Sequence, residues 1–530
     1  MHDTKENFHR AADLVKFWGK QKLPSGKTLE ETLTINGLPL WDVISPTLAL
    51  SHVSKILSEG DRYPSSSRLS LWKHKSKTMA LDMILPVIGN NNGCVKWPVE
   101  PVFLFLGFSY YIYRETLQPV AVRIKNRKDI KSIVLHDSLH DAKNHPSSGE
   151  NESQSIWQHW GGDARSKADL FHKTYSSALH EIKSSNGLLQ IIKDRDTSIW
   201  PQMEGTFGWL LEAFIPRMLK QAAVAAHIFE RHSPALIVSP DVNDPRTRLY
   251  CLIGHQFNVP TLEIQFGFYG LNDIEWRFFI ADHLAVTGDV NRGIMLEHNV
   301  PPERMTVTGS PRYDSLMNLR DGISSLTKEK LKIPKNKIMV LFASQPHYYG
   351  AFSSDEARIA MIDALFNTVA DMDNLYLVVK PHPVDNAGQL KQLAGDKQNI
   401  LFVDKVLDIR DLIKISDAFV TFFSGTTFDS LVMNKPTINL SFPGSYDSNL
   451  FEESGATLVA RTAEDIKRFL HMICIGKITG LLDDVAVKRE SFLREWFYRL
   501  DGCAAERIEA IALKMAALKP SADFLKEQNN

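Results

Sequence analysis

The sequence has no excess of charge of either sign, because its 530 residues include 61 Lys and Arg against 62 Asp and Glu. Proteins that bind DNA or RNA normally present a broad positive field to the phosphate backbone. The charge balance therefore excludes nucleic acid as an expected partner. Apolar residues make up 44% of the chain and charged residues 23%, which is typical of a folded protein rather than of a disordered or fibrous one.

Cysteine is scarce as well, with only four in the chain, and no two of them form a CxxC pair or a metal-type spacing. In small secreted domains, closely spaced cysteines form disulfides, and in zinc sites, pairs of cysteines bind the metal. The pattern predicts reduced thiols and a cytoplasmic protein. The four are Cys94, Cys251, Cys474 and Cys503.

Long apolar runs are also missing. The first 20 residues are polar and charged and lack the apolar core of an export signal. The most apolar run, residues 101–113 (PVFLFLGFSYYIY), is shorter than the roughly 20 residues that span a bilayer. It predicts a buried strand or helix. The alternative is an interfacial patch that associates peripherally with the inner membrane.

A chain of this length exceeds what one hydrophobic core organises, so we expect two domains. From residue 235 onward, short β-branched runs alternate with helical stretches, which is typical of βα units around a parallel sheet. A helix is expected over 246–258 and a fresh strand begins near 337. The expected strands are 235–239, 261–265, 283–288, 305–309, 337–344, 375–380, 399–403, 418–423 and 436–440.

These patterns predict an α/β protein with two Rossmann-like domains. We expect an N-terminal domain over 1–320, a nucleotide-binding domain over 321–485 and closing helices over 486–530. The part before residue 230 is rich in aromatic residues, and its pattern predicts neither a topology nor a chemistry. Its stretch 145–162 is rich in Ser, Asn, Gly and His and predicts a loop.

Lys380-Pro381-His382-Pro383 follows the expected strand 375–380 directly. In an α/β domain, this edge of the sheet carries the ligand site. The prolines fix the backbone on either side of an imidazole, which is able to donate to a phosphate oxygen or to titrate near neutral pH. A rigid turn with an exposed histidine is the alternative.

Ser424-Gly425-Thr426-Thr427 follows the expected strand 418–423 and opens a helix. Backbone N–H groups and hydroxyls at such a turn cradle phosphate, assisted by the helix dipole. Asp429 lies early in that helix, where a carboxylate would accept hydrogen bonds from ribose hydroxyls. An ordinary Ser/Thr helix cap explains the turn equally well.

Both motifs follow strands of one expected parallel sheet, so they face the same crevice. A histidine beside a phosphate-binding turn suits a nucleotide leaving group, whose departure builds negative charge. The sequence therefore predicts a nucleotide site at the edge of the second domain.

Three segments resemble the C-terminal half of GT-B glycosyltransferases of bacterial surface-polysaccharide synthesis. This group includes CDP-glycerol glycerophosphotransferases, polysialyltransferases and Kdo transferases of capsule assembly. The resemblance covers roughly residues 235–515. The segments are VTGSPRYD (307–314), the strand followed by KPHP, and DAFVTFFSGTTFDSLVMNKPTINL (417–440).

The resemblance implies a GT-B fold with an interdomain cleft, in which His382 and Pro383 contact the donor phosphate. It also implies that the turn 424–427 holds phosphate and that Asp429 holds ribose. Arg312 falls in the Gly-x-Pro-Arg-x-Asp segment at the hinge, where a salt bridge with Asp314 is the alternative.

One departure concerns the catalytic base. The glycerophosphotransferase branch has Gln-His-Gly after the strand 261–265, whereas this chain has Gln265-Phe266-Gly267. A base must then come from elsewhere in the first domain, and Asp244 and Asp241 are the candidates because they follow the strand 235–239. The same segment also reads as a turn and helix cap. No Asp-x-Asp stands in a metal context, so we expect no essential metal and no cofactor.

The leading hypothesis is a metal-independent inverting glycosyltransferase that moves a sugar from a CMP-Kdo or CMP-sialic acid type of donor. Its acceptor would be a cell-surface glycan or glycolipid. The alternatives are a CDP-alditol phosphotransferase, a non-hydrolysing sugar-nucleotide epimerase, which has a segment similar to 300–309, and a non-catalytic glycan-assembly protein.

Overall fold

The computed structural model divides the described chain into two compact units. The N-terminal unit comprises residues 2–286, 292–311 and 505–530, and the C-terminal unit comprises residues 287–291 and 312–504. We describe each unit separately. The structure describes residues 2–59, 95, 97–137, 152–184, 187–267, 273–322, 324, 326–346, 354–404, 406–422, 424–442, 448–476 and 479–517.

The N-terminal unit is built on a seven-stranded parallel sheet of order β11-β10-β9-β8-β3-β4-β5. Counted from β3 as the first strand, the order is 3-2-1-4-5-6-7, which is the Rossmann order with one strand added. The order therefore reverses between β3 and β8. The strands are β3 (Val102–Leu106), β4 (Lys131–His136), β5 (Glu152–Ser155), β8 (Leu236–Ser239), β9 (Thr261–Ile264), β10 (His283–Val286) and β11 (Met305–Val307).

Strand β3 lies at the centre of this sheet and is buried on both faces. Leu104 and Leu106 pack into a core with the helices of one face, whereas Phe103 and Phe105 pack into a second core on the other. Because side chains alternate along a strand, burial of both faces requires a continuous apolar run. The first core includes α1 (His2–Gly19), α3 (Leu40–Leu48), α9 (Gly162–Ser184), α11 (Trp200–Trp209), α12 (Ile215–His232) and α13 (Pro245–Gln256).

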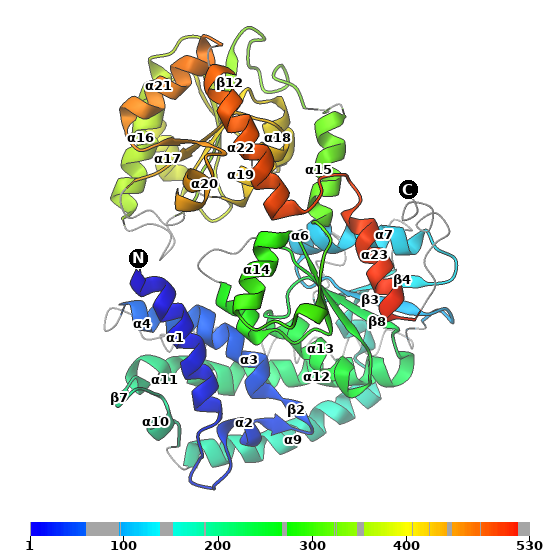
Figure 1. The fold of residues 1–530 in the computed structure, drawn as a ribbon. Coiled ribbons are helices and arrows are strands. Elements are labelled where there is room, and N and C mark those ends of the chain that lie inside the picture. Colours follow the sequence, from blue (N-terminus) through cyan, green and yellow to red (C-terminus); the bar gives the residue numbers. More distant parts are fainter. Residues whose placement is uncertain are drawn as a thin grey trace. The chain divides into compact units, whose positions relative to one another are not determined.

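The second core contains α23 (Ala504–Met515), the last helix that the structure describes, together with α7 (Gln118–Lys125). Glu509 on α23 accepts from Arg123 Nε on α7 at 2.7 Å. Figure 1 shows α23, in red, beside β3, β4 and α7, which are drawn in cyan. α23 therefore completes the N-terminal unit.

The C-terminal unit contains a six-stranded parallel sheet of order β14-β13-β12-β15-β16-β17. Counted from β12, this is the order 3-2-1-4-5-6, and the reversal lies between β12 and β15. The strands are β12 (Ile338–Ala343), β13 (Leu375–Lys380), β14 (Ile400–Phe402), β15 (Ala418–Thr421), β16 (Thr437–Leu440) and β17 (Leu458–Ala460).

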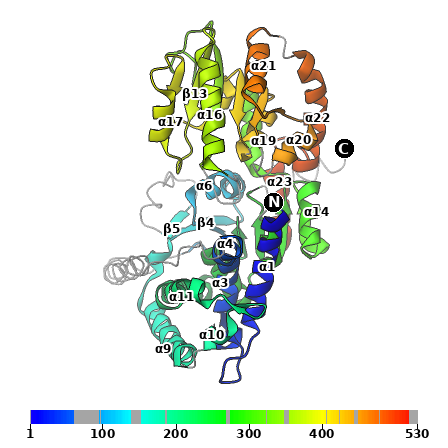
Figure 2. The same ribbon diagram turned by 90° about the vertical axis from the view of Figure 1, so that its left-hand side faces the viewer.

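Helices cover both faces of this sheet. Val340 and Phe342 of β12 pack in one core with α16 (Asp355–Ala370), α17 (Ala387–Ala394) and α21 (Ala463–Cys474). The other face carries α18 (Ile409–Ile415) and α19 (Gly425–Val432). Figure 2 shows α16 and α17 side by side. α20 (Ser448–Ser454) and α22 (Thr479–Phe497) pack beside α19.

The short segment 287–291 belongs to the C-terminal unit because it packs against the end of α22. A Cβ at Gly288 would lie 2.2 Å from the backbone oxygen of Trp496. Only glycine allows this approach.

The sequence predicted the two parallel α/β domains and the nine strands from residue 235 to 440, and the structure confirms both. The run 101–113 contains the buried strand β3, as predicted. The strands β4, β5 and β17 were missed. Residues 145–151 of the predicted loop lie outside the described residues, and the prediction is wrong for 152–155, which form β5.

The predicted domain limits differ from the two units. The C-terminal unit begins at residue 312 rather than 321, and it includes α22. α23, expected to act with α22 as a closing segment, joins the N-terminal unit instead from its second residue onward. No helix in the described ranges is both long enough and apolar enough to cross a membrane.

We expect Ile508→Ala on α23 to destabilise the N-terminal unit by about 2–5 kcal/mol, because Ile508 is fully buried in its second core. Nine of the ten tryptophans belong to the sequence of this unit, so urea unfolding followed by tryptophan fluorescence reports on it. Lys514→Ala on the exposed side of α23 is the matched control. Equal midpoints for the two variants would contradict the packing of α23.

Candidate functional site

In the C-terminal unit, polar side chains gather where β12, β13 and β15 end. All three strands are parallel, so their carboxyl ends share one edge. Ser344 follows β12, Lys380 ends β13, and Ser424 lies three residues after β15. The strands β12 and β15 flank the point where the strand order reverses, and parallel sheets bind ligands at such a point.

His382 is held by hydrogen bonds on this edge. Its backbone N–H donates to Ser344 Oγ at 3.1 Å, and its Nδ1 accepts from the Val384 N–H at 3.4 Å. An Nδ1 that accepts must carry no proton, so in the neutral ring the proton lies on Nε2. The half-buried imidazole therefore has the tautomer that donates through Nε2. Pro383 beside it is exposed.

The loop that carries His382 is anchored by buried charges. Ser344 Oγ donates to Asp385 Oδ2 at 2.6 Å. The other oxygen of Asp385 lies 3.8 Å from Nη1 of Arg358, and both side chains are buried. Arg358 Nη1 also donates to the carbonyl of Gln345 after β12. These contacts connect α16, the end of β12 and the loop after β13, so they fix the backbone around His382.

Lys380 is half-buried at the end of β13 and donates to the carbonyl of Asp404 at 3.3 Å. Burial lowers the pKa of its ammonium from the ordinary value. A cation at this position adds positive potential to the strand edge, which favours an anionic ligand.

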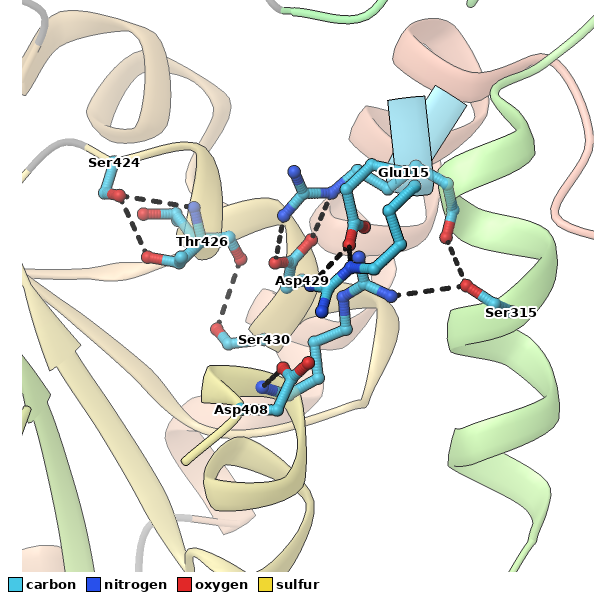
Figure 3. A network of polar contacts seen from close by, with 11 residues as sticks. Glu115, Ser315, Asp408, Ser424, Thr426, Asp429 and Ser430 are labelled. Atoms are coloured by element: carbon cyan, nitrogen blue, oxygen red, sulfur yellow. Dashed lines mark hydrogen bonds and ion pairs between the residues drawn. The ribbon is translucent and has the colours of Figure 1, made fainter. Parts of the chain in front are cut away.

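The turn after β15 is a helix N-cap. Ser424 Oγ accepts from the Thr426 N–H at 3.3 Å and from the Thr426 hydroxyl at 2.9 Å, as Figure 3 shows. The turn therefore forms the Ser/Thr helix cap that was the alternative to a phosphate site. Gly425, the exposed first residue of α19, adds a backbone N–H at the positive end of the helix dipole.

Thr427 departs from the predicted cradle. Its side chain is fully buried, and its Oγ1 accepts from Asn439 Nδ2 at 3.3 Å. This hydroxyl bonds within the unit, so the turn offers Ser424, Gly425 and Thr426 to a ligand.

Asp429 is also buried, with 0% of its side chain exposed. Arg312 on α15 (Pro311–Asp321) donates to both of its oxygens, through Nη2 at 2.6 Å and Nε at 3.3 Å (Figure 3). A carboxylate with no exposed surface and a bidentate guanidinium partner has no room for a ribose hydroxyl. The ribose contact expected of Asp429 is therefore replaced by an ion pair.

This ion pair also concerns the alternative role of Arg312, which was a salt bridge with Asp314. The arginine pairs with Asp429, and Asp314 accepts from the backbone N–H of Ala504 at 3.0 Å. Arg312 is thus a structural side chain in this arrangement, and it joins α15 to α19.

The N-terminal unit presents a second polar group at the corresponding edge of its sheet. Asp244 caps α13 by accepting from the Arg246 N–H at 2.8 Å. It also forms two hydrogen bonds with the Arg246 guanidinium, at 2.6 and 3.0 Å. Arg246 extends to Asp137 after β4 at 2.8 Å, and its guanidinium lies over the Phe108 ring. Both oxygens of Asp244 are therefore engaged.

Asp241 has a different environment. Its Oδ1 accepts a local bond from the Asn243 N–H at 2.8 Å. Burial, together with the charge of Asp244, raises the pKa of Asp241 to about 6, although the hydrogen bond from the Asn243 N–H acts in the opposite direction. A carboxylate that titrates near neutral pH is suited to accept a proton.

Glu263 is a fully buried residue of β9, and it lies beside Asp241. Its Oε1 accepts from the Val242 N–H at 3.3 Å. Burial, together with the charge of Asp241, raises the pKa of Glu263 to about 8. At neutral pH Glu263 is therefore protonated and Asp241 is ionised. Neighbouring carboxyl groups with separated pKa values are typical of acid–base sites.

Sequence reasoning missed several of these residues. Ser344 ended a predicted strand, and Glu263 is a charged residue inside a predicted buried strand, which was a usable signal. Asp137 follows a strand that the sequence did not reveal. Arg358 and Asp385 gave no local signal, because they meet only through the fold.

The comparisons with known proteins come from sequence and from structure. Residues 279–513 match the family described as CDP-Glycerol:Poly(glycerophosphate) glycerophosphotransferase, which is less than half of the chain. No curated protein sequence matches the chain. The match gives no support to the expected resemblance to Kdo transferases or polysialyltransferases.

Among solved structures, one from Listeria monocytogenes that carries the name UDP-N-acetylglucosamine 2-epimerase superposes with a TM-score of 0.52 at 12% identity. The alignment covers 80% of this chain and 99% of that one. The wall teichoic acid polymerase TagF gives 0.46 at 12% identity, covering 85% and 99%. The epimerase from Methanocaldococcus jannaschii gives 0.49 at 12% identity, covering 78% and 99%. At this identity the Listeria match shows the two-domain fold alone.

We expect Asp429→Ala to destabilise the C-terminal unit by about 3–5 kcal/mol, because it leaves the Arg312 guanidinium buried without its partner. Asp411→Ala at the more exposed start of α18 is the control, with an expected change below about 1 kcal/mol. Circular dichroism during urea unfolding measures both. If Asp429→Ala were as stable as wild type but had lost nucleotide binding, Asp429 would be a ligand after all.

Proposed function

We propose that this chain is a transferase that takes its donor from a cytidine nucleotide and releases CMP, extending a cell-surface polymer. The edge of the C-terminal sheet carries this proposal. It combines an imidazole in the Nε2–H tautomer, a capped helix N-terminus and a half-buried lysine at the strand-order reversal. Such groups stabilise the charge that develops on a departing phosphate.

Two donor classes fit this edge. With a CDP-alditol, the acceptor oxygen attacks the β-phosphorus, the bond from that phosphorus to the bridging oxygen breaks, and CMP leaves. With a CMP-activated acidic sugar such as Kdo or sialic acid, the acceptor oxygen attacks the anomeric carbon and the bond to the phosphate oxygen breaks. CMP leaves in both reactions, so the same site serves either.

The family match over 279–513 supports the CDP-alditol class. Phe266, where that family was expected to have histidine, weighs against its ordinary base and keeps the CMP-sugar class as the second candidate. The fold likeness to an epimerase adds no functional support. The epimerase and non-catalytic readings therefore rank below the transferase.

We assign acceptor activation to Asp241, which takes the proton of the acceptor hydroxyl. Protonated Glu263 leaves Asp241 as the ionised member of the pair at neutral pH. Asp244 is already bound to Arg246 and to the α13 N-terminus, so its role is structural. The acceptor is a glycan or glycolipid, and association with the inner membrane remains a prediction.

A metal-independent mechanism also remains a prediction. Among the residues that the structure describes, no group of three or more His, Cys, Asp or Glu side chains is placed to hold an ion. In the proposal, His382, Lys380 and the turn 424–426 meet the charge of the leaving phosphate.

Incubating the chain with CDP-glycerol labelled at the β-phosphorus, or with CMP-Kdo, tests the donor and the reaction together. Release of CMP with an acceptor preparation supports the proposal. Label in the product identifies phosphotransfer, and unlabelled glycoside identifies sugar transfer.

We expect His382→Ala to lower CMP release roughly a hundredfold with little change in melting temperature. His471→Ala on α21 is the control. CMP release at wild-type rate from His382→Ala, or no CMP release from any donor, would contradict the proposal.

The pH profile separates the two aspartates. We expect Asp241→Asn to abolish transfer, and wild-type activity to fall as the pH drops below about 6, because protonated Asp241 accepts no proton. Asp244→Asn retains the helix cap and should remain active. In Asp244→Asn, the pH below which activity falls should be lower than in wild type, because the charge of Asp244 raises the pKa of Asp241. If activity of Asp244→Asn fell at the same acidic pH as that of wild type, or if Asp241→Asn were active, the base would lie elsewhere.

A further inference from the structure

The C-terminal unit contains a cavity of about 810 Å³ that shares no residue with the donor edge. Val432 and Asn434 line it at the C-terminal end of α19, whereas Ser424 caps the opposite end of that helix. The remaining walls come from the end of α15, from α22 and from the segment 498–501. The proposed function does not use this cavity.

Four arginines line the cavity against two acidic residues, Glu490 and Asp501. Arg320 is paired with Asp321 at 2.8 Å, and Arg494 with Glu490 at 3.1 Å. The other two arginines, Arg489 and Arg499, have no hydrogen bond or ion pair with any residue that the structure describes. The guanidinium of Arg499 lies over the ring of Tyr498, 5.1 Å from its centroid.

Arg489 is half-buried on α22, and burial lowers the pKa of its guanidinium. The charge of Glu490 offsets this loss of water only in part, so the partly buried guanidinium remains less favourable in the free protein. An anion in the cavity removes that cost, since the planar fork of an arginine donates two hydrogen bonds to a phosphate.

The cavity is also partly apolar. Val432, Leu493 and Leu500 line it, and Val487 on α22 is 72% exposed. Apolar side chains beside unpaired arginines suit a ligand that joins an anionic group to an uncharged portion.

We propose that this cavity binds a phosphate ester through Arg489 and Arg499. The phosphate comes either from a free phosphate compound or from the headgroup of an anionic lipid, and the chemistry of recognition is the same. In the lipid case the cavity attaches the C-terminal unit to an anionic membrane surface.

The experiment uses the full chain with two probes. Calorimetric titration with inorganic phosphate measures the free anion, and co-sedimentation with phosphatidylglycerol vesicles, compared with phosphatidylcholine vesicles, measures the headgroup. Arg489→Gln and Arg499→Gln should each weaken binding of the recognised probe at least tenfold. Arg468→Gln, an exposed arginine of α21 paired with Asp465, should bind as wild type does.

Loss of phosphate binding in the two variants assigns a free phosphate compound, and loss of phosphatidylglycerol binding alone assigns the headgroup. Arg499 is exposed, so Arg499→Gln tests the proposal even if Arg489→Gln fails to fold. Equal binding by wild type and Arg499→Gln in both assays, or binding of neither probe by wild type, overturns it.

Discussion

The order in which the parallel strands lie side by side is the constraint on which the candidate site depends. In each unit the order reverses next to the first strand, between β12 and β15 in one and between β3 and β8 in the other. The connections leaving those strands turn to opposite sides, so their carboxyl ends leave space for a ligand. His382 and Ser424 lie at one such edge, and Asp241 lies at the other. The topology thus determines where the candidate site residues lie.

Buried ion pairs hold these edges in shape. Arg358 and Asp385 fix the loop of His382, and Arg312 and Asp429 join α15 to α19, the helix that Ser424 caps. A buried pair adds little net stability, because desolvation offsets the attraction, but losing one partner is costly. Such pairs therefore specify one arrangement of the elements around the site.

The sequence predicted most of the strands that form apolar runs, but it missed β4 (KSIVLH) despite its apolar pattern, and it missed β5 and β17. β12 and β13 are apolar β-branched runs, which only a buried strand explains. β5 is ESQS at the edge of its sheet and has no apolar signal, whereas β17 is apolar but has only three residues. The prediction of the site residues depended on the predicted strands as well. His382 and Ser424 were found because they follow predicted strands. The burial of Asp429 was not, because its partner Arg312 is 117 positions away and an acidic residue early in a helix is usually exposed.

The central claim is that the C-terminal unit binds a cytidine nucleotide, and a thermal-shift comparison of CMP, CDP, UDP and GDP tests it most directly. A ligand present at a hundred times its Kd stabilises the native state by about 2.7 kcal/mol, which raises the melting temperature by several degrees. We expect CMP and CDP to produce this rise and UDP and GDP to produce little. A rise with UDP or GDP that equals the rise with CMP, or no rise with any of the four nucleotides, would contradict the account.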